Sequence, residues 1–264
     1  MRLETILRRF PVAVDLGARN GAFSEALAAS DAAASIDVLF EADLSARMLG
    51  AGNGLRVVAD EERLPFGDAT LDLAVSTLSL HWTNDLVGAL IQIRRALRPD
   101  GLFIGAIFGG ATLTELRQAL LQAEDEVTGG ASLRVSPFAD AIDAAGLLQR
   151  AGFALPVADV DRVKVRYGHP IELLRDLRRM GETSVLLDRS RKPMGRRVLA
   201  RAMEIYVGRF AEADGRVPAT FEIVAVTGWA PHESQQKPLR PGSAKMRLAD
   251  ALGAVEQSAG EKPA

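Results

Sequence analysis

A strand that runs into a glycine turn carries the clearest chemical signal in the sequence. Residues 13–16 are apolar apart from Asp15, and Gly17 and Gly21 follow this run. Gly17 permits a tight turn, and Gly21 allows the next helix to begin close to the sheet. The first N–H groups of a helix are unpaired and its dipole is positive there, which suits a ligand carboxylate or phosphate. We therefore expect a nucleotide-type cofactor at this turn.

Arg19 departs from the usual form of such a turn. The acidic-x-Gly-x-Gly-x-Gly pattern has a middle glycine, and Arg19 stands in its place. Its guanidinium can reach a carboxylate of the cofactor and replace contacts of the glycine backbone. The alternative is that this long side chain crowds the site.

A second acidic residue lies where a ribose would be bound. Asp43 comes just after the apolar run 36–40 and 26 residues after Gly17. A carboxylate roughly 20–30 positions after a glycine turn usually accepts hydrogen bonds from the ribose hydroxyls. Dinucleotides and S-adenosylmethionine are both open as cofactors at this point. The competing interpretation is that Asp43 only caps a helix beginning at Leu44.

Two further strand ends carry polar residues. Asp60 and Glu61 follow the third apolar run, and Ser76 ends the fourth. The carboxylate of Asp60 can accept from the amino group of an adenine, or it can belong to a solvated acidic turn. Because the carboxyl ends of parallel strands meet at one edge of a sheet, we expect these residues to border the same site as Asp15.

Strands alternate with helices over the first half of the chain. The predicted strands are 13–16, 36–40, 55–59, 71–76 and 102–108. This alternation is typical of a doubly wound α/β fold with a parallel sheet, in which ligands bind beyond the carboxyl ends of the strands. Ser136 and Pro137 predict the start of a further helix, which ends at Gly152.

The second half of the chain is less regular. The predicted strands are 155–160, 163–167 and 220–229. Apolar residues at helical spacing predict a helical insertion over residues 168–217, before the last strand. We expect residues 1–230 to form one domain and residues 231–264 to form an extended or disordered tail.

Composition narrows the classes of function. The net charge is −2, which gives no reason to expect a nucleic-acid partner, and the absence of cysteine excludes disulfides and thiolate metal sites. No apolar run reaches the ~20 residues that a membrane-spanning helix needs. The 3 histidines are widely spaced and form no two-histidine, one-carboxylate iron motif, so we expect no metal site.

Five segments, taken in order, resemble the class I S-adenosylmethionine-dependent methyltransferases. They are Asp15–Gly17, Asp43–Ser45, Asp60–Phe66, Leu71–Ser76 and Leu97–Gly101. The resemblance implies a doubly wound, mostly parallel, seven-stranded Rossmann-like sheet with S-adenosyl-L-methionine as the cofactor. It also implies a role for each residue at the strand ends. The methionine end of the cofactor would be held by Asp15, Gly17 and Gly21, and Arg19, which departs from the family pattern, is a cofactor-binding candidate through its guanidinium. The ribose would be held by Asp43 and Leu44, the adenine by Asp60 and the backbone of Glu61, and Ser76 would line the site.

A narrower resemblance covers nearly the whole chain. Five further blocks are similar to the complex I assembly factor 5 family: Ser79–Trp82, Arg98–Gly110, Leu177–Glu182, Val217–Thr220 and Gly228–Gln235. This implies an S-adenosylmethionine-binding enzyme of the methyltransferase fold that acts on a protein substrate, a subunit of respiratory complex I. Animal members are associated with arginine hydroxylation, so the modification is methyl transfer or hydroxylation. The resemblance also implies a bacterial, cytoplasmic protein, which its partner can bring to the inner membrane.

Two other functions are compatible with the sequence. One is a non-catalytic assembly chaperone of complex I, which Arg19 and the short segment before the first strand suggest. The other is a carboxyl O-methyltransferase for a carrier protein or small molecule, because a more distant resemblance links the chain to malonyl-carrier-protein O-methyltransferases of biotin synthesis. The sequence does not identify the oligomeric state.

His81 and Trp82 are the candidate residues of the substrate pocket. They follow the fourth strand, where methyltransferases place residues that contact the substrate. His81 can act as a base near neutral pH, or it can pack at the start of the next helix. Trp82 is expected to form a pocket wall, and His169, next to Pro170, is expected to be structural. The sequence does not identify a catalytic residue.

Overall fold

The structure is a computed structural model that describes residues 2–50, 55–138, 140–185, 193–236 and 253. The chain divides into two units, Met1–Pro231 and His232–Ala264. All the elements below belong to the first unit. The tail predicted from residue 231 lies mostly outside the described residues.

The described residues form one seven-stranded sheet. Its strands are β1 (Val12–Leu16), β2 (Val38–Asp43), β3 (Leu55–Val58), β4 (Leu71–Thr77), β5 (Leu97–Phe108), β6 (Ala154–Tyr167) and β7 (Val217–Trp229). The strand order is β3-β2-β1-β4-β5-β7-β6. The first five strands pair in parallel, and β7 runs antiparallel between β5 and β6. The predicted doubly wound, mostly parallel fold is confirmed.

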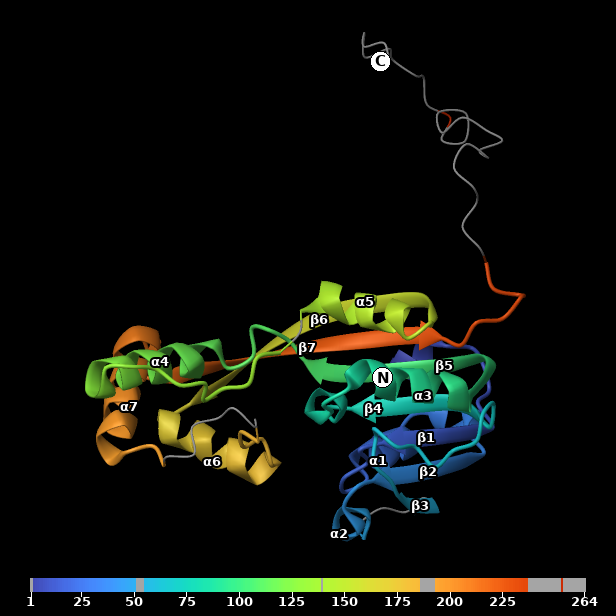
Figure 1. The fold of residues 1–264 in the computed structure, drawn as a ribbon, viewed down its shortest axis with the longest axis horizontal. Coiled ribbons are helices and arrows are strands. Elements are labelled where there is room, and N and C mark those ends of the chain that lie inside the picture. The colour runs from blue at the N-terminus through green and yellow to red at the C-terminus, as the bar shows by residue number, and fades with distance from the viewer. Residues whose placement is uncertain (1, 51–54, 139, 186–192, 237–252, 254–264) are drawn as a thin grey trace. The chain divides into compact units, whose positions relative to one another are not determined.

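Helices connect and cover these strands (Figure 1). They are α1 (Ala22–Ala28), α2 (Ala46–Leu49), α3 (Leu86–Ala96), α4 (Thr114–Thr128), α5 (Ala141–Arg150), α6 (Pro170–Met180) and α7 (Arg196–Phe210). Short 3-10 turns are η1 (Arg2–Thr5), η2 (Asp31–Ser35) and η3 (Leu80–Trp82). None of the described helices combines the length and apolar character needed to cross a membrane.

The prediction of two strands over residues 155–167 was wrong, because β6 is one long strand. The polar pair Asp161 and Arg162 does not make a turn. Both residues pair with β7, and Arg162 Nε donates to Glu222 Oε2 on that neighbouring strand at 2.7 Å. A charged partner across the ladder therefore keeps the strand continuous.

The prediction that Ser136 caps a helix was also wrong. α5 begins at Ala141, and its cap is Asp140, whose Oδ1 accepts from the N–H of Asp143 at 2.8 Å. Gly152 follows the end of this helix with a φ of 84°, in the left-handed conformation that was expected of a terminating glycine.

Of the three hydrophobic clusters among the described residues, two are large. One packs the main sheet against α3 and α5, around residues such as Leu90, Ile93 and Phe103. The other joins α4, α6 and α7 to the far end of β7, with Tyr206 and Leu173 among its buried members. Figure 1 shows these helices grouped around the ends of β6 and β7 that extend beyond the parallel strands.

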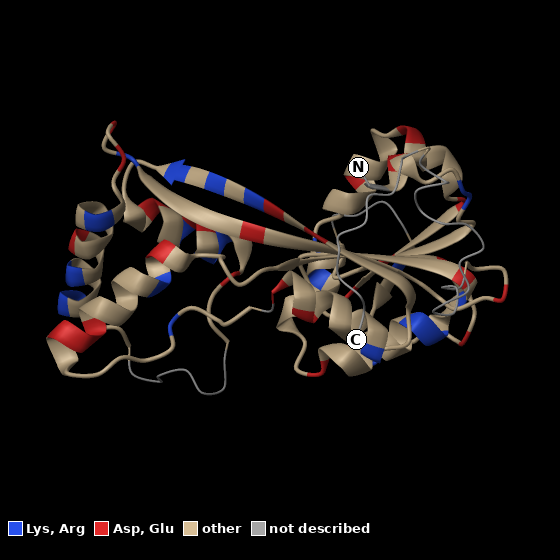
Figure 2. Ribbon diagram, turned by 90° about the horizontal axis from the view of Figure 1, so that it is seen from above, with Lys and Arg blue, Asp and Glu red and all other residues tan. Residues whose placement is uncertain are grey.

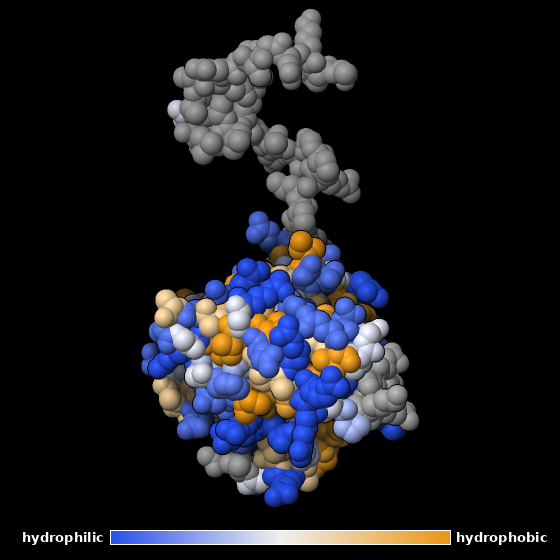
Figure 3. Space-filling model, turned by 90° about the vertical axis from the view of Figure 1, so that its left-hand side faces the viewer, coloured by the Kyte–Doolittle hydropathy of each residue, from blue (hydrophilic) through white to orange (hydrophobic). Residues whose placement is uncertain are grey.

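The surface of this helical part is mostly polar. Figure 3 looks onto that end of the molecule and shows a largely hydrophilic face interrupted by scattered apolar side chains, an ordinary pattern for a protein surface. Along β6, the exposed side chains of Arg162, Lys164 and Arg166 form the basic bands visible in Figure 2.

Candidate functional site

The strand register brings the predicted cofactor residues to one edge of the sheet. Asp15 pairs with Glu41 of β2, and the next residue, Leu16, pairs with Ser76 of β4. Asp15 and Ser76 are each only 1% exposed. Within the described part of the chain, Asp15 Oδ1 and Ser76 Oγ are buried without a hydrogen-bond partner. Buried polar atoms without a partner are costly, so this edge is suited to a polar ligand.

Asp15 has an unusual protonation equilibrium. Burial, followed by the nearby Glu41 and Asp43 carboxylates, raises its pKa from 3.8 to about 8. The side chain is therefore mostly neutral at pH 7 in the free protein. A positively charged ligand group placed beside it would favour its ionised form.

The glycine turn has a tightly constrained backbone. Gly17, Arg19 and Gly21 all have positive φ, at 69°, 49° and 80°. A Cβ built on Gly17 would lie 2.1 Å from Ser79 Oγ, so only glycine fits there. Arg19 adopts the left-handed conformation that a glycine would take without strain.

The side chain of Arg19 reaches away from the turn to Leu78 and Glu182. Its Nη2 donates to the carbonyl of Leu78 at 2.9 Å and contacts Glu182 Oε1 at 3.1 Å. Whether this guanidinium also binds a cofactor carboxylate, or crowds the cofactor, stays a prediction.

Asp43 holds the glycine turn in place. Its Oδ2 accepts from the N–H of Arg19 at 2.9 Å, and its Oδ1 accepts from the N–H of Ser45 at 2.7 Å. The cap of α2 is Ser45, whose Oγ accepts from the N–H of Met48. Asp43 thus lies before the helix cap, beside the turn. Its neighbour Leu44 is 66% exposed.

The residues after β3 are more open to solvent. Asp60 is exposed, and its Oδ1 accepts from the N–H of Glu62 at 2.9 Å. The carboxylate of Glu61 accepts from Ser79 Oγ at 2.5 Å. Glu61 is thereby linked to the side chain that packs on Gly17, while the adenine role of Asp60 stays a prediction.

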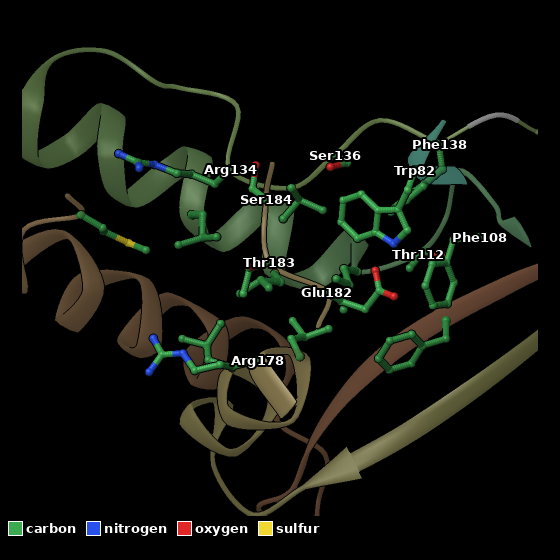
Figure 4. Close-up of a pocket in the computed structure, with 18 residues that line it drawn as sticks. Trp82, Phe108, Thr112, Arg134, Ser136, Phe138, Arg178, Glu182, Thr183 and Ser184 are labelled. Atoms are coloured by element: carbon green, nitrogen blue, oxygen red, sulfur yellow. The ribbon is translucent and has the colours of Figure 1, made fainter. Parts of the chain in front are cut away.

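A cavity of about 290 Å³ includes Glu182, the partner of Arg19, in its lining. Most of its lining is apolar or aromatic, including Trp82, Phe108, Phe138 and Phe221 (Figure 4). Its polar lining groups include Glu182 and Ser184, and Ser184 Oγ is buried with no hydrogen-bond partner among the described residues. The cavity therefore combines aromatic walls with a carboxylate.

His81 stands between the aromatic walls and this carboxylate. Its side chain is 4% exposed, and Nε2 lies 3.4 Å from Glu182 Oε2. The ring centroid lies 5.2 Å from that of Trp82 and 4.9 Å from that of Phe108. His81 is thus buried beside the cavity, and Trp82 forms part of the cavity wall.

Glu182 is a site residue that the sequence did not single out by its chemistry. Its side chain is 8% exposed. Burial raises its pKa, but hydrogen bonds and charges from His81 and Arg19 outweigh burial and hold the pKa below its usual range. The carboxylate is therefore ionised at neutral pH.

A helix end fixes the position of Glu182. Gly181 ends α6 with a φ of 81°, and the N–H of Glu182 donates to the carbonyl of Leu177 at 2.8 Å. A glycine directly after a helix, followed by an acid, was the available signal in the sequence. At the other end of this helix, Nδ1 of His169 accepts from the N–H of Ile171 at 3.2 Å, so His169 is a helix cap.

No group of three or more His, Asp or Glu side chains arranged to hold a metal ion occurs among the described residues.

Comparisons with known proteins identify related chains. A family model described as a methyltransferase domain matches residues 14–105. The arginine-hydroxylase NDUFAF5 of Danio rerio is 41% identical over 254 residues, covering 94% of this chain and 78% of that protein. The Homo sapiens protein of the same name is 42% identical over 259 residues, covering 96% and 73%. Malonyl-[acyl-carrier protein] O-methyltransferase of Laribacter hongkongensis is 38% identical over 186 residues, covering 70% and 60%.

Solved structures share the fold at low sequence identity. The YcgJ protein of Bacillus subtilis superposes with a TM-score of 0.58 at 13% identity, covering 88% of this chain and 97% of that one. A phosphoethanolamine N-methyltransferase of Haemonchus contortus, in complex with S-adenosylhomocysteine, gives a TM-score of 0.51 at 14% identity, covering 86% and 50%.

Proposed function

Because this chain belongs to the NDUFAF5 family of class I S-adenosylmethionine-dependent methyltransferases, we propose that it is an enzyme that modifies an arginine side chain of a protein substrate. The observation that carries this proposal is the contact of 3.1 Å between Arg19 Nη2 and Glu182 Oε1. It joins the glycine turn, where the cofactor is expected, to the aromatic cavity, where an acceptor is expected. The reaction centre then lies between the turn and the cavity.

The cofactor-side residues fit S-adenosylmethionine. The buried Oδ1 of Asp15 and Oγ of Ser76 can receive polar hydrogens of the ligand. The methionine end would lie along the glycine turn, the ribose at Asp43 and Leu44, and the adenine at Asp60 and Glu61. When bound, S-adenosylmethionine supplies an electrophilic methyl group.

On the acceptor side, Nδ1 of His81 is the ring nitrogen that can accept a proton, because Nε2 faces the carboxylate of Glu182 and donates to it. Alignment of nucleophile and electrophile accounts for much of the rate of such transfers. The contact with Glu182 orients the imidazole, which packs behind Trp82 and Phe108 of the cavity wall. The proposal covers two reaction types, which differ in what they add to the acceptor. Methyl transfer adds a CH₂ unit, and hydroxylation adds an oxygen atom.

A carrier-protein carboxyl methyltransferase is the weaker alternative. A relative named malonyl-[acyl-carrier protein] O-methyltransferase supports it. That relative covers less of this chain, 70%, than the Danio rerio and Homo sapiens NDUFAF5 proteins do, and the cavity lining carries charges of both signs, with Arg134 and Arg178 as well as Glu182. A non-catalytic assembly chaperone is the third candidate, and it requires that the cofactor site no longer binds S-adenosylmethionine.

Two measurements test the proposal. Calorimetric titration with S-adenosylmethionine should give a Kd tighter than ~100 μM, and Asp43→Ala should abolish binding. Mass spectrometry of the complex I subunits from cells with and without this gene should then show one subunit whose mass depends on the gene. Tight cofactor binding with every subunit mass unchanged would contradict the enzymatic proposal, and absent cofactor binding would favour the chaperone.

The partner and the location belong to the same proposal. The family resemblance supports a subunit of respiratory complex I as the partner, in the bacterial cytoplasm. Peripheral contact with the inner membrane would come through that subunit.

Arg19→Gly tests the cofactor side, since weaker S-adenosylmethionine binding indicates a guanidinium–carboxylate contact and tighter binding indicates crowding.

A further inference from the structure

The cavity carries the chemistry that recognises a cationic, planar side chain. Aromatic faces attract a guanidinium through cation–π contacts, and a carboxylate pairs with it through charge-assisted hydrogen bonds. In Figure 4 the carboxylate of Glu182 lies on the same side of the cavity as the rings of Trp82 and Phe108. The guanidinium groups of Arg134 and Arg178 lie toward the other side of that view.

Glu182 already binds a guanidinium from within the chain. Arg19 reaches it with one nitrogen, Nη2, which also donates to the carbonyl of Leu78 at 2.9 Å. The contact is therefore single and shared, whereas a guanidinium can pair with a carboxylate through two parallel hydrogen bonds. The side chain of Arg19 is 33% exposed, so it can leave toward solvent.

Because Glu182 is buried, replacement of Arg19 by another cation is more favourable than the departure of Arg19 with nothing in its place. A carboxylate that is 8% exposed is costly to leave without a positive partner. Displacement of Arg19 therefore favours the entry of another cation at Oε1, while Oε2 keeps its contact with His81. Ser184 Oγ, buried in the same lining without a described partner, offers this cation one more hydrogen-bond acceptor.

We propose that Glu182 is the residue that selects an arginine side chain of the substrate, and that Arg19 occupies its place until the substrate enters. This inference rests on the proposed function for the identity of the substrate. In this arrangement Glu182 recognises the substrate, and Arg19 competes with the substrate for Glu182. The glycine turn and the substrate cavity then communicate through one side chain, since Arg19 belongs to the first and binds in the second.

The test is a binding titration with small probes. N-acetyl-arginine amide carries the guanidinium, and N-acetyl-citrulline amide is its neutral counterpart of nearly the same shape. The chain has 2 tryptophans, so Trp229→Phe leaves Trp82, in the cavity wall, as the only indole reporter. Quenching of its fluorescence follows the probe without S-adenosylmethionine and without turnover.

We expect saturable quenching with at least tenfold tighter binding of the arginine probe than of the citrulline probe. Glu182→Gln should abolish this preference. Arg19→Ala should tighten binding of the arginine probe about fivefold, because the internal competitor is gone. Glu115→Gln is the matched control, since it neutralises another buried carboxylate, bonded to Thr220, that does not line the cavity.

The expected pattern can fail in two ways. Equal binding of the two probes by the parent protein, or a preference that survives Glu182→Gln, would overturn the role of Glu182. An arginine affinity unchanged or weakened in Arg19→Ala would overturn the role of Arg19 as a competitor. If Glu182→Gln fails to fold by circular dichroism, Glu182→Asp serves instead, because it keeps the charge but withdraws it from the cavity and should weaken the arginine probe alone. Unmodified complex I subunits beside an intact probe preference would contradict the proposed function and leave this inference standing.

Discussion

Replacement of Asp15 by asparagine should stabilise the protein while it removes cofactor binding. The pKa of Asp15 is raised from 3.8 to about 8 in the folded state. The folded protein thus holds this proton more tightly than the unfolded chain does. The contribution of Asp15 to stability therefore falls as the pH rises from about 3.8, and it becomes constant above about 8.

The size of this effect follows from the pKa shift. One unit of pKa difference corresponds to about 1.4 kcal/mol, so between pH 4 and pH 7 the cost of Asp15 grows by about 3–4 kcal/mol. Asparagine has nearly the same shape and no titration. The free energy of unfolding of Asp15→Asn, relative to the parent protein, should increase by that amount over the same pH range.

Urea unfolding at several pH values between 4 and 8 measures the difference directly. Curves of the two proteins that run parallel with pH would refute the reasoning, because they would show that Asp15 does not titrate as its burial requires. Asp72→Asn is the matched control. Asp72 lies at the start of β4, where it pairs with Arg98 at 2.7 Å, and its loss should leave S-adenosylmethionine binding intact.

Cofactor binding by the parent protein should release a proton at pH 7. A cationic group of the ligand beside Asp15 favours the ionised carboxylate, so the proton that this carboxyl holds leaves on binding. Calorimetry in two buffers of different ionisation enthalpy should show nearly one proton released per cofactor. Proton exchange of zero would indicate that the charged end of the ligand does not meet Asp15.

Three further substitutions test other parts of the structure. Gly17→Ala should lower the free energy of unfolding by at least ~2 kcal/mol and abolish S-adenosylmethionine binding. Gly129 has a similar φ of 74° but open space around it, so Gly129→Ala should lower the free energy of unfolding by only ~1 kcal/mol, as measured by urea unfolding. Gly181→Ala should lower the free energy of unfolding by ~1–2 kcal/mol and weaken binding of the arginine probe severalfold, while the calorimetric affinity for the cofactor stays unchanged. An unchanged affinity for the arginine probe would argue against the helix end as the support of Glu182. Tyr206→Phe removes a hydrogen bond of 2.7 Å to the carbonyl of Pro218 and should lower the free energy of unfolding by ~1 kcal/mol, and no loss in thermal or urea unfolding would contradict this.

The cofactor side of the site follows from local patterns in the sequence. Parallel strands end at one edge of a sheet, so the position of Asp15 in β1 and of Ser76 in β4 could be predicted from apolar runs alone. The register of β1 and β4 pairs Ser76 with Leu16, the residue after Asp15, so the two polar residues lie on neighbouring strands one position apart. The glycine turn was equally readable, because the need for positive φ at Gly17 and Gly21 is local.

The surroundings of the cavity depend on long-range contacts that no local pattern encodes. Arg19 and Glu182 are separated by 163 positions, and neither spacing nor periodicity links them. Ser136 was misassigned because its sequence context matches a helix cap, whereas in the structure it lines the cavity. The polar pair Asp161 and Arg162 was misassigned because the ion pair to Glu222 forms across the ladder.

The division of the chain into a cofactor sheet and a helical part has a consequence for redesign. Apart from Trp82, Phe108 and Phe221, every residue that lines the cavity comes from two segments, 112–138 and 174–194. Both segments leave and rejoin the sheet at its β5, β6 and β7 side, away from β1, β2 and β3. Substitutions in these segments can therefore change the cavity lining while β1, β2 and β3 keep their sequence, and the contact of Glu182 with Arg19 is the link between the two parts. The shape of the cavity is thus set mainly by two stretches of chain that can be redesigned on an unchanged parallel sheet.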